Sequence, residues 1–575
     1  MVISLRHCCF ALVCSAFGAA ANAQSLTGVP IACKGERVTR IDIDARPPFQ
    51  VTGNNFWQRF GRFTRKAHAT TKDRVIRRFM ALEIGDPCTE LRRSESERIL
   101  RAQPFLADAN IIAVADGTGG VVLNVMTVDE VSLILGGALS SQNPNIRAIR
   151  LGQANLMGEG MYVAGQWKSS RFFRDVVSGK FVDYQFLGRP YQLSVEGGRR
   201  EIGSDWATEL SHPFLTDLQR LSWRTTAGSS EGYFHFRRPE ARPAALYFAR
   251  AYGDIGGVVR FGPPLGKIAL VGGSVSYEDE DPGRRPVVII DALILPDSST
   301  ALIDRYSANR TTRLNGLWGV RNIDFIRATG FDALEGAQDL RTGVQVATLI
   351  GKGVKFLGGR EDDWFGSTEL YGGFGSPRSF AAVDITGEGR RDQDGKWDGM
   401  LAHGRGAIYL KPFERHKHTV ITDLAWSGGW KQRVPFQLTF ADRDGGVRGF
   451  RKADVGGGRR LVGRFEDRYV IGKFRKLASI GVAGFGEAGK IWAGDSPFGV
   501  DTKVHSSIGV SFLAAAPPQS RRLWRVDFAY PVSGDRSGWE VRVTAKDLTR
   551  VFRPEPRDIF SSRERSVPSS VFNWP

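Results

Sequence analysis

The sequence predicts a mainly β protein, in which a transmembrane antiparallel β-barrel follows one small mixed domain. Three observations predict this fold. The chain opens with the pattern of an export signal, residues 36–130 change their hydrophobic period from strand to helix and back, and residues 131–548 keep the two-residue alternation of half-buried strands. With 42% hydrophobic residues among 575, the chain can build a core, which excludes a largely disordered protein.

Residues 1–23 have the pattern of a secretory signal peptide. A positive start of Arg6 and His7 precedes an apolar stretch at 8–20, and residues 21–23, Ala-Asn-Ala, fit the small-residue cleavage pattern. The apolar stretch is too short to span a bilayer as a helix. We therefore expect a cleaved signal, and an uncleaved anchor is the alternative.

Two cysteines, Cys33 and Cys88, remain once the signal is removed. An even pair in an exported protein favours a disulfide. Because a sequence does not give the distance between the two Cβ atoms, two free thiols are the alternative. Cys33 falls in a short linker, residues 24–35, that precedes the mixed domain.

The mixed domain, residues 36–130, has the predicted order β-α-α-β-β. Strands are indicated by alternating residues and helices by apolar residues at helical spacing. Gly85-Asp86-Pro87 separates the two helices, and a turn rich in Asp and Gly joins the last two strands. The predicted elements are a strand at 37–44, helices at 71–82 and 89–103, and strands at 109–115 and 121–128.

Residues 131–548 alternate between apolar or aromatic residues and polar ones, most clearly at 436–440, 524–530 and 539–546. A soluble sandwich would also alternate, but the export signal and the aromatic residues at strand ends favour a barrel in lipid. Lipid leaves backbone groups without water, so the strands must close into a ring. At roughly 28 residues per strand and loop, we expect about 16 strands, an even number. A soluble all-β exported protein is the alternative.

Two short segments stand out within the barrel region. Val447-Arg448-Gly449-Phe450 is the end of a glycine-bounded tip, in which glycine permits a tight turn beside the arginine. Further along, Phe485, Glu487 and Gly489 share one face of a predicted strand. An arginine and a carboxylate are thus offered by separate segments of the barrel.

These segments resemble motifs of the BamA/TamA superfamily of outer-membrane assembly and two-partner-secretion transporters, which have a surface-antigen type of barrel. In that family a VRG(F/Y) motif is the tip of a long extracellular loop that folds back into the lumen. Residues 485–492, FGEAGKIW, resemble a strand motif whose acid holds the loop arginine. The resemblance implies that Arg448 pairs with Glu487, which replaces the usual Asp. A solvated loop arginine is the alternative.

Residues 36–130 resemble a polypeptide-transport-associated (POTRA) domain. The resemblance rests on the order of the elements, on LEIGD at 82–86, on SESERILRAQPFL at 94–106 and on VVLNVMTVDE at 121–130. A single such domain is visible, fewer than the better-known members of the superfamily carry. Another kind of small α+β domain is the alternative.

The resemblance implies insertion of proteins into the outer membrane of a Gram-negative cell, or their translocation across it, with the small domain in the periplasm. The implied partners are unfolded outer-membrane or secreted client proteins, outer-membrane lipid and lipopolysaccharide, and periplasmic chaperones or accessory proteins. The net charge of +18 suits lipopolysaccharide phosphates and acidic clients, and we expect no nucleic-acid partner. A dedicated exporter of one partner, or a passive porin or surface-binding barrel, is the alternative.

No set of nucleophile, base and orienting group is evident, so we expect no enzymatic activity and no catalytic residues. We likewise expect no metal site and no cofactor. Residues 549–575 follow the last predicted strand and contain four prolines, at 554, 556, 568 and 575. Because proline is incompatible with a paired central strand, we expect an irregular periplasmic tail, with a strand-like plug as the alternative.

Overall fold

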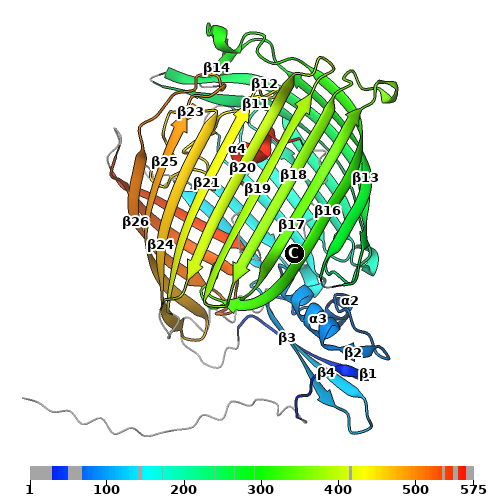
Figure 1. The fold of residues 1–575 in the computed structure, drawn as a ribbon. Coiled ribbons are helices and arrows are strands. Elements are labelled where there is room, and N and C mark those ends of the chain that lie inside the picture. The colour runs from blue at the N-terminus through cyan, green and yellow to red at the C-terminus, as the bar shows by residue number, and fades with distance from the viewer. Residues whose placement is uncertain are drawn as a thin grey trace, which may run out of the picture.

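The computed structural model describes residues 29–49, 68–139, 146–170, 173–239, 241–264, 266–290, 292–412, 417–533, 538–547 and 555–564. The predicted signal peptide lies outside the described residues. A small N-terminal module sits at one end of a large β-barrel (Figure 1), and the opposite end is called the far end below. No helix among the described residues is long and apolar enough to cross a membrane.

In its described residues, 34–49 and 68–129, the N-terminal module is a four-stranded sheet covered by two helices. In it β1 pairs in parallel with β4, and β3 forms an antiparallel hairpin with β4, so that the sheet has the order β2-β1-β4-β3. Its elements are β1 (Lys34–Arg46), α2 (Asp73–Arg78), β2 (Pro87–Thr89), α3 (Glu90–Ala102), β3 (Leu106–Ala115) and β4 (Val121–Asp129).

Strand β2 was not predicted, because a strand of three residues is too short to show alternation. It ends at Thr89, whose side chain caps α3 by accepting a hydrogen bond from the backbone of Arg92. Cys33 and Cys88 form a disulfide that ties the start of β1 to β2. Both cysteines belong to the buried core of the module.

The barrel is closed and antiparallel, as predicted, but its wall has 20 strands in the part of the chain that the structure describes, not about 16. Its strands are β5 (Leu133–Leu139), β6 (Ile146–Gln153), β7 (Met161–Lys168), β8 (Val176–Asp183), β9 (Gln192–Arg199), β10 (Ser204–His212), β11 (Leu221–Arg238), β12 (Ala241–Phe261), β13 (Ile268–Pro282), β16 (Asn309–Thr329), β17 (Ala337–Gly353), β18 (Trp364–Gly375), β19 (Ser379–Arg391), β20 (Trp397–Leu410), β21 (His418–Trp430), β24 (Arg459–Phe474), β25 (Ala478–Trp492), β26 (His505–Ala515), β27 (Arg522–Pro531) and β28 (Glu540–Asp547).

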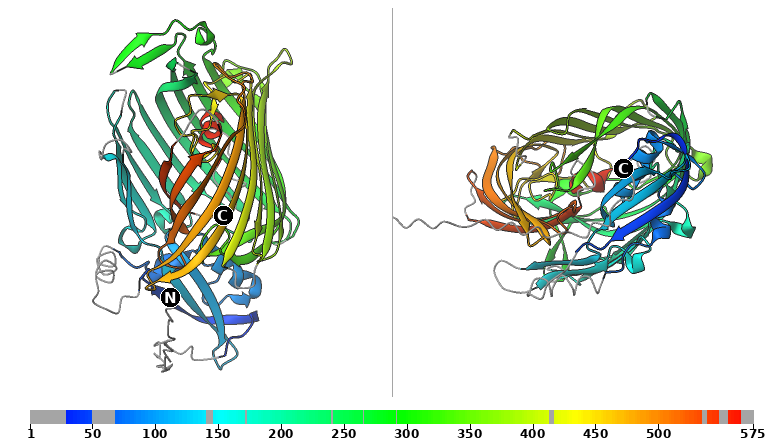
Figure 2. Two further views of the ribbon diagram at one scale, coloured as in Figure 1. Left: turned by 90° about the vertical axis from the view of Figure 1, so that its left-hand side faces the viewer. Right: turned by 90° about the horizontal axis from the view of Figure 1, so that it is seen from below.

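The predicted strand number was too low because the early strands are short. Strand β5 has 7 residues and β10 has 9, so each shows only a few alternations, and strand plus loop takes fewer residues than we assumed. The first and last wall strands, β5 and β28, are neighbours in the ring and close it. A hairpin of β14 (Val287–Ile290) and β15 (Leu293–Pro296) leaves the wall at the far end (Figure 2), while β13 pairs directly with β16.

The outer surface of the barrel is apolar and its interior is polar. On β24, Leu461 and Phe465 point outward, whereas Arg464 and Glu466 are buried inside. On β26, Phe512 is 57% exposed while its neighbour Ser511 is 1% exposed. A soluble barrel would show the reverse pattern, so this one is built to face lipid.

Two of the described segments of the chain occupy the lumen. One is the loop between β21 and β24, residues 431–458, called the lumen loop below. The other is residues 555–564, called the C-terminal segment below, which contains α4 (Arg557–Ser562) and lies inside the barrel towards the far end (Figures 1 and 2).

The prediction of a periplasmic tail is therefore wrong for residues 555–564. The prolines do keep this segment out of the wall, but its charged side chains find opposite charges inside the lumen. Asp558 pairs with Arg460 of β24 at 3.0 Å, and Arg563 pairs with Glu388 of β19 at 3.0 Å. The other residues of the predicted tail, 549–554 and 565–575, lie outside the described residues.

Candidate functional site

The tip of the lumen loop is packed against the barrel wall. Phe440, Val447 and Phe450 are buried and contact Val462 of β24 and Ile491 of β25. Within the loop, β22 (Leu438–Thr439) pairs with β23 (Gly456–Gly457). Apolar packing and local pairing thus hold the loop inside the barrel, at the point where its arginine is presented.

Arg448 contacts Glu487 of β25 through both its backbone and its side chain. The Arg448 Nε atom lies 2.7 Å from Oε1 of Glu487, and the Arg448 backbone amide donates to Oε2 at 2.7 Å. The guanidinium carbon also lies 3.4 Å from the centroid of the Phe485 ring. Since Phe485 and Glu487 face the lumen from one strand, β25 offers the arginine a carboxylate and an aromatic face together.

Two further carboxylates reach the same guanidinium. Asp527 of β27 lies 3.2 Å from Nη1 and Glu466 of β24 lies 3.4 Å from Nη2. Arg448 is therefore held by three carboxylates, each from a different strand. A charge buried in this way is costly to leave unpaired, so the tip of the loop has one strongly preferred position.

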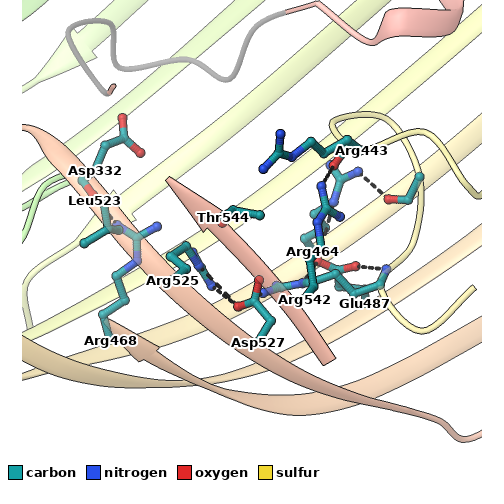
Figure 3. A pocket seen from close by; sticks show the side chains of 12 residues that line it. Asp332, Arg443, Arg464, Arg468, Glu487, Leu523, Arg525, Asp527, Arg542 and Thr544 are labelled. Atoms are coloured by element: carbon teal, nitrogen blue, oxygen red, sulfur yellow. Dashed lines mark hydrogen bonds and ion pairs between the residues drawn. The ribbon is translucent and has the colours of Figure 1, made fainter. Parts of the chain in front are cut away.

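The network continues along the lumen wall (Figure 3). Arg525 bridges Glu466 at 2.8 Å and Asp527 at 3.1 Å, and Arg464 pairs with Asp423 of β21 at 3.0 Å. Sequence alternation indicated that Glu466 and Asp527 lie on polar strand faces. It gave no register, and without a register we did not predict that both meet Arg448.

Backbone conformation and close packing explain why positions 449 and 489 of the two motifs are glycine. Gly449 has φ of +89°, a left-handed conformation that favours glycine. A Cβ atom on Gly489 would lie 2.8 Å from a methyl of Val447 and 3.0 Å from the Phe440 ring. The loop tip therefore approaches β25 as closely as it does because position 489 carries no side chain.

The lumen loop also touches the last wall strand. The Arg542 side chain of β28 donates to the backbone carbonyl of Arg443 at 2.9 Å, and the Arg451 amide donates to Glu540 at 3.2 Å. The loop thus connects the pinned Arg448 to β28, one of the two strands that close the ring.

A cavity of only about 60 Å³ remains beside this network, lined by both motif residues and wall arginines. Its lining is Asp332, Arg443, Gly446, Arg448, Arg464, Arg468, Glu487, Leu523, Arg525, Asp527, Arg542 and Thr544.

The module is docked onto the near end of the barrel through α3. Arg101 pairs with Asp339 of β17 at 2.6 Å, and Glu97 pairs with Arg327 of β16 at 3.0 Å. The Arg98 side chain donates to the carbonyl of Leu215 at 2.8 Å. Seen from below, the module lies across the near end of the barrel (Figure 2).

The acid Glu95 is central to this contact. Burial by itself would raise its pKa, but the neighbouring Arg98 and hydrogen bonds from Arg98 and Thr216 hold the pKa below its ordinary value. Glu95 is thus charged in the docked state, and its charge is stabilised by both the module and the barrel loop that contains Thr216.

No protein-family model matches the sequence, and no curated protein sequence matches it. Among solved structures, the chain is similar to a BamA from Haemophilus ducreyi that lacks POTRA domains 1–3, with 13% identity over 88% of this chain and 83% of that one and a TM-score of 0.38. It is also similar to CdiB from Escherichia coli, with 11% identity over 88% and 75% and a TM-score of 0.40. CdiB from Acinetobacter baumannii gives 11% identity over 88% and 72% and a TM-score of 0.38.

Proposed function

We propose that this chain inserts proteins into the outer membrane or translocates them across it, and that it catalyses no chemical reaction. The observation that carries the proposal is the lumen loop, which three carboxylates hold by Arg448 inside the barrel. The loop is enclosed in the barrel, is held by the ion pairs of Arg448 and contacts β28, which closes the ring. This arrangement suits a transporter that opens and closes better than a permanently open pore.

The proposed gate is the junction of β5 and β28. In the part of the chain that the structure describes, these two strands have 7 and 8 residues, as short as β6 to β9 beside them and much shorter than β16 and β17 with 21 and 17. Fewer backbone hydrogen bonds make a strand pair easier to open. Because the lumen loop contacts β28 at Glu540 and Arg542, movement of the loop would change the junction directly.

The N-terminal module is the proposed POTRA-like periplasmic receptor for unfolded client proteins. Strand β3 lies at one edge of its sheet, where Pro30 bridges to Val114 and where Arg93 and Arg101 donate to its outer carbonyls, so a client strand would replace these contacts. A client segment would add to such an edge as a further strand, with main-chain hydrogen bonds supplying most of the affinity. On this proposal the apolar outer surface contacts outer-membrane lipid and lipopolysaccharide, and chaperones or accessory proteins deliver the clients.

A passive porin is the competing proposal. A porin needs an open aqueous lumen, whereas the lumen loop, the C-terminal segment and the arginine network occupy this one. Insertion of many membrane proteins and export of one dedicated partner both remain compatible with the geometry.

Depletion of the protein, followed by quantitative proteomics of the outer membrane and the culture medium, tests the proposal. A broad fall in barrel proteins would identify an insertase, and loss of one secreted or surface protein would identify an exporter. Rescue by the wild-type gene but not by Arg448→Ala would connect the result to the lumen loop. An unchanged proteome in both fractions would overturn the proposal in favour of a passive barrel.

A further inference from the structure

The C-terminal segment is bound inside the lumen by contacts that resemble those of a peptide in a receptor. Its first anchor is Asp558, whose Oδ2 atom accepts hydrogen bonds from Arg460 at 3.0 Å and from the backbone amide of Thr439 at 2.9 Å. The Asp558 backbone amide in turn donates to Asp442 at 2.8 Å. Two of these three partners belong to the lumen loop.

The second anchor is Glu564. Its carboxylate pairs with Arg390 of β19 at 3.2 Å and with Arg313 of β16. Next to it, Arg563 pairs with Glu388 of β19. Arg313 and Arg390 are buried inside the barrel, and the Glu388 side chain is 4% exposed.

Between the anchors lies one apolar contact. Ile559 is fully buried against Leu401 of β20 and against Phe436 and Leu438 of the lumen loop. The site therefore offers two cationic positions, one anionic position and an apolar recess. Shape and charge together specify which segment fits it.

The charges of the wall show which ligand the site selects. Among the described residues, the ion pairs of Arg390 and Arg460 are made with the C-terminal segment alone, whereas Arg313 also pairs with Asp363 at 2.7 Å. Withdrawal of the segment would remove the ion-pair partners of two buried arginines and leave Arg390 only the longer-range attraction of Glu278, Glu280 and Asp363, a costly state. A vacated site would therefore select another carboxylate-bearing ligand.

We propose that this part of the lumen is a binding site for acidic polypeptide segments, and that the chain's own C-terminal segment is its removable occupant. The favoured ligand carries carboxylates at the positions of Asp558 and Glu564 and an apolar residue next to the first. The identification of such a segment as part of a client rests on the proposed function. Displacement of the occupant also removes the contacts that Asp558 makes with Thr439 and Asp442, so client entry loosens the lumen loop.

A fluorescent decapeptide with the sequence of residues 555–564, EPRDIFSSRE, is the probe. It is titrated against the purified full-length protein in lipid nanodiscs and followed by anisotropy. The wild type should bind it weakly, because the site is filled. The full-length variant Asp558→Asn/Glu564→Gln should release its own segment and bind the peptide at least tenfold more tightly, with saturation.

Three controls define the site. A scrambled peptide of the same composition should not saturate. Adding Arg390→Gln to the double variant should weaken peptide binding at least tenfold, since a hydrogen-bonded charge pair is lost. Arg557→Gln, which removes an exposed charge from the same helix, should behave as the wild type.

Single-channel conductance of the same proteins gives an independent reading. The double variant should conduct more than the wild type, and added decapeptide should reduce its conductance again. The inference is overturned if the scrambled peptide binds equally well, if the conducting double variant has no affinity for the decapeptide, or if the double variant neither conducts nor binds. None of these results depends on a client, so they leave the proposed function untouched.

Discussion

Glu487 receives both the backbone amide and the guanidinium of Arg448, each at 2.7 Å, although 39 residues separate the two in the chain. Because one carboxylate binds both the main chain and the side chain of Arg448, it fixes the position of the loop backbone as well as that of the guanidinium. The lumen loop is thereby joined to β25 more rigidly than a side-chain ion pair alone would join it.

Removal of the loop arginine should abolish function. Arg448→Ala leaves three buried carboxylates without the cation that they share, at a cost on the order of 3 kcal/mol. We expect client assembly or export to fall at least tenfold and the melting temperature in detergent to drop. Arg451→Ala, an exposed arginine of the same loop, is the control. Full client yield in Arg448→Ala would show that the pinned loop is dispensable.

Substitution of Glu487 should separate charge from reach. Glu487→Gln keeps an oxygen for the Arg448 amide but loses the ionic partner, and we expect a partial loss of activity. Glu487→Asp keeps the charge but shortens the reach by one methylene, and it should retain more activity than Gln. A double-mutant cycle of thermal stability with Arg448→Ala should give a coupling of about 1–3 kcal/mol. Additive effects would contradict a direct interaction.

Position 489 should not tolerate a side chain. Gly489→Ala would bring a methyl to 2.8 Å from Val447 and displace the loop tip, so both stability and activity should fall. Gly486→Ala, on the same strand, meets nothing within 4 Å and is the matched control. Protease accessibility of the lumen loop and client yield measure the outcome. Equal behaviour of the two variants would rule out a steric role for Gly489.

Docking of the module should weaken in acid. The folded-state pKa of Glu95 lies below its ordinary value, so its stabilising effect is complete above about pH 4.3 and is lost as the pH falls through the folded value. Burial raises the pKa of Asp108 and Asp217 near this contact, and protonation of those two acts in the opposite direction.

Hydrogen exchange of α3 at pH 7 and at pH 3 measures this effect. Exchange is expressed as protection relative to the intrinsic rate at each pH, because intrinsic amide exchange is itself slowest near pH 3. We expect lower protection of α3 at pH 3 in the wild type and a smaller change in Glu95→Gln, which lacks the titrating group. The same change in both proteins would assign the pH response to other residues.

The closing strands should exchange their amide hydrogens faster than the rest of the wall. Because β5 and β28 form the proposed gate, we expect lower protection there than in β7 and β8, which are equally short among the described residues and lie within the wall. Arg448→Ala should lower the protection of β28 further, since the lumen loop contacts this strand. Equal protection around the ring would count against a gate at this junction.

Local patterns were enough to predict the class of the fold. The alternation at 524–530 indicated that Asp527 lies on the polar face of its strand, because strand geometry places alternate residues on opposite faces. The short strands β2 and β5–β10 were undercounted for the same reason, since a few residues show little periodicity. The meeting of Arg448 and Glu487 was accessible only through the motif resemblance.

The sequence by itself determined that the chain is a closed barrel preceded by a mixed module. The spacing of apolar residues is a local property, and it shows which face of each strand or helix lies against lipid or core and which lies against water. Tertiary structure alone decided that Glu466 and Asp527 join Arg448, that Gly489 must be small, and that the C-terminal segment turns back into the lumen. Each depends on strand register and on charges from distant segments. A buried charge takes whatever partner the closed barrel brings near, and no stretch of sequence specifies that partner in isolation.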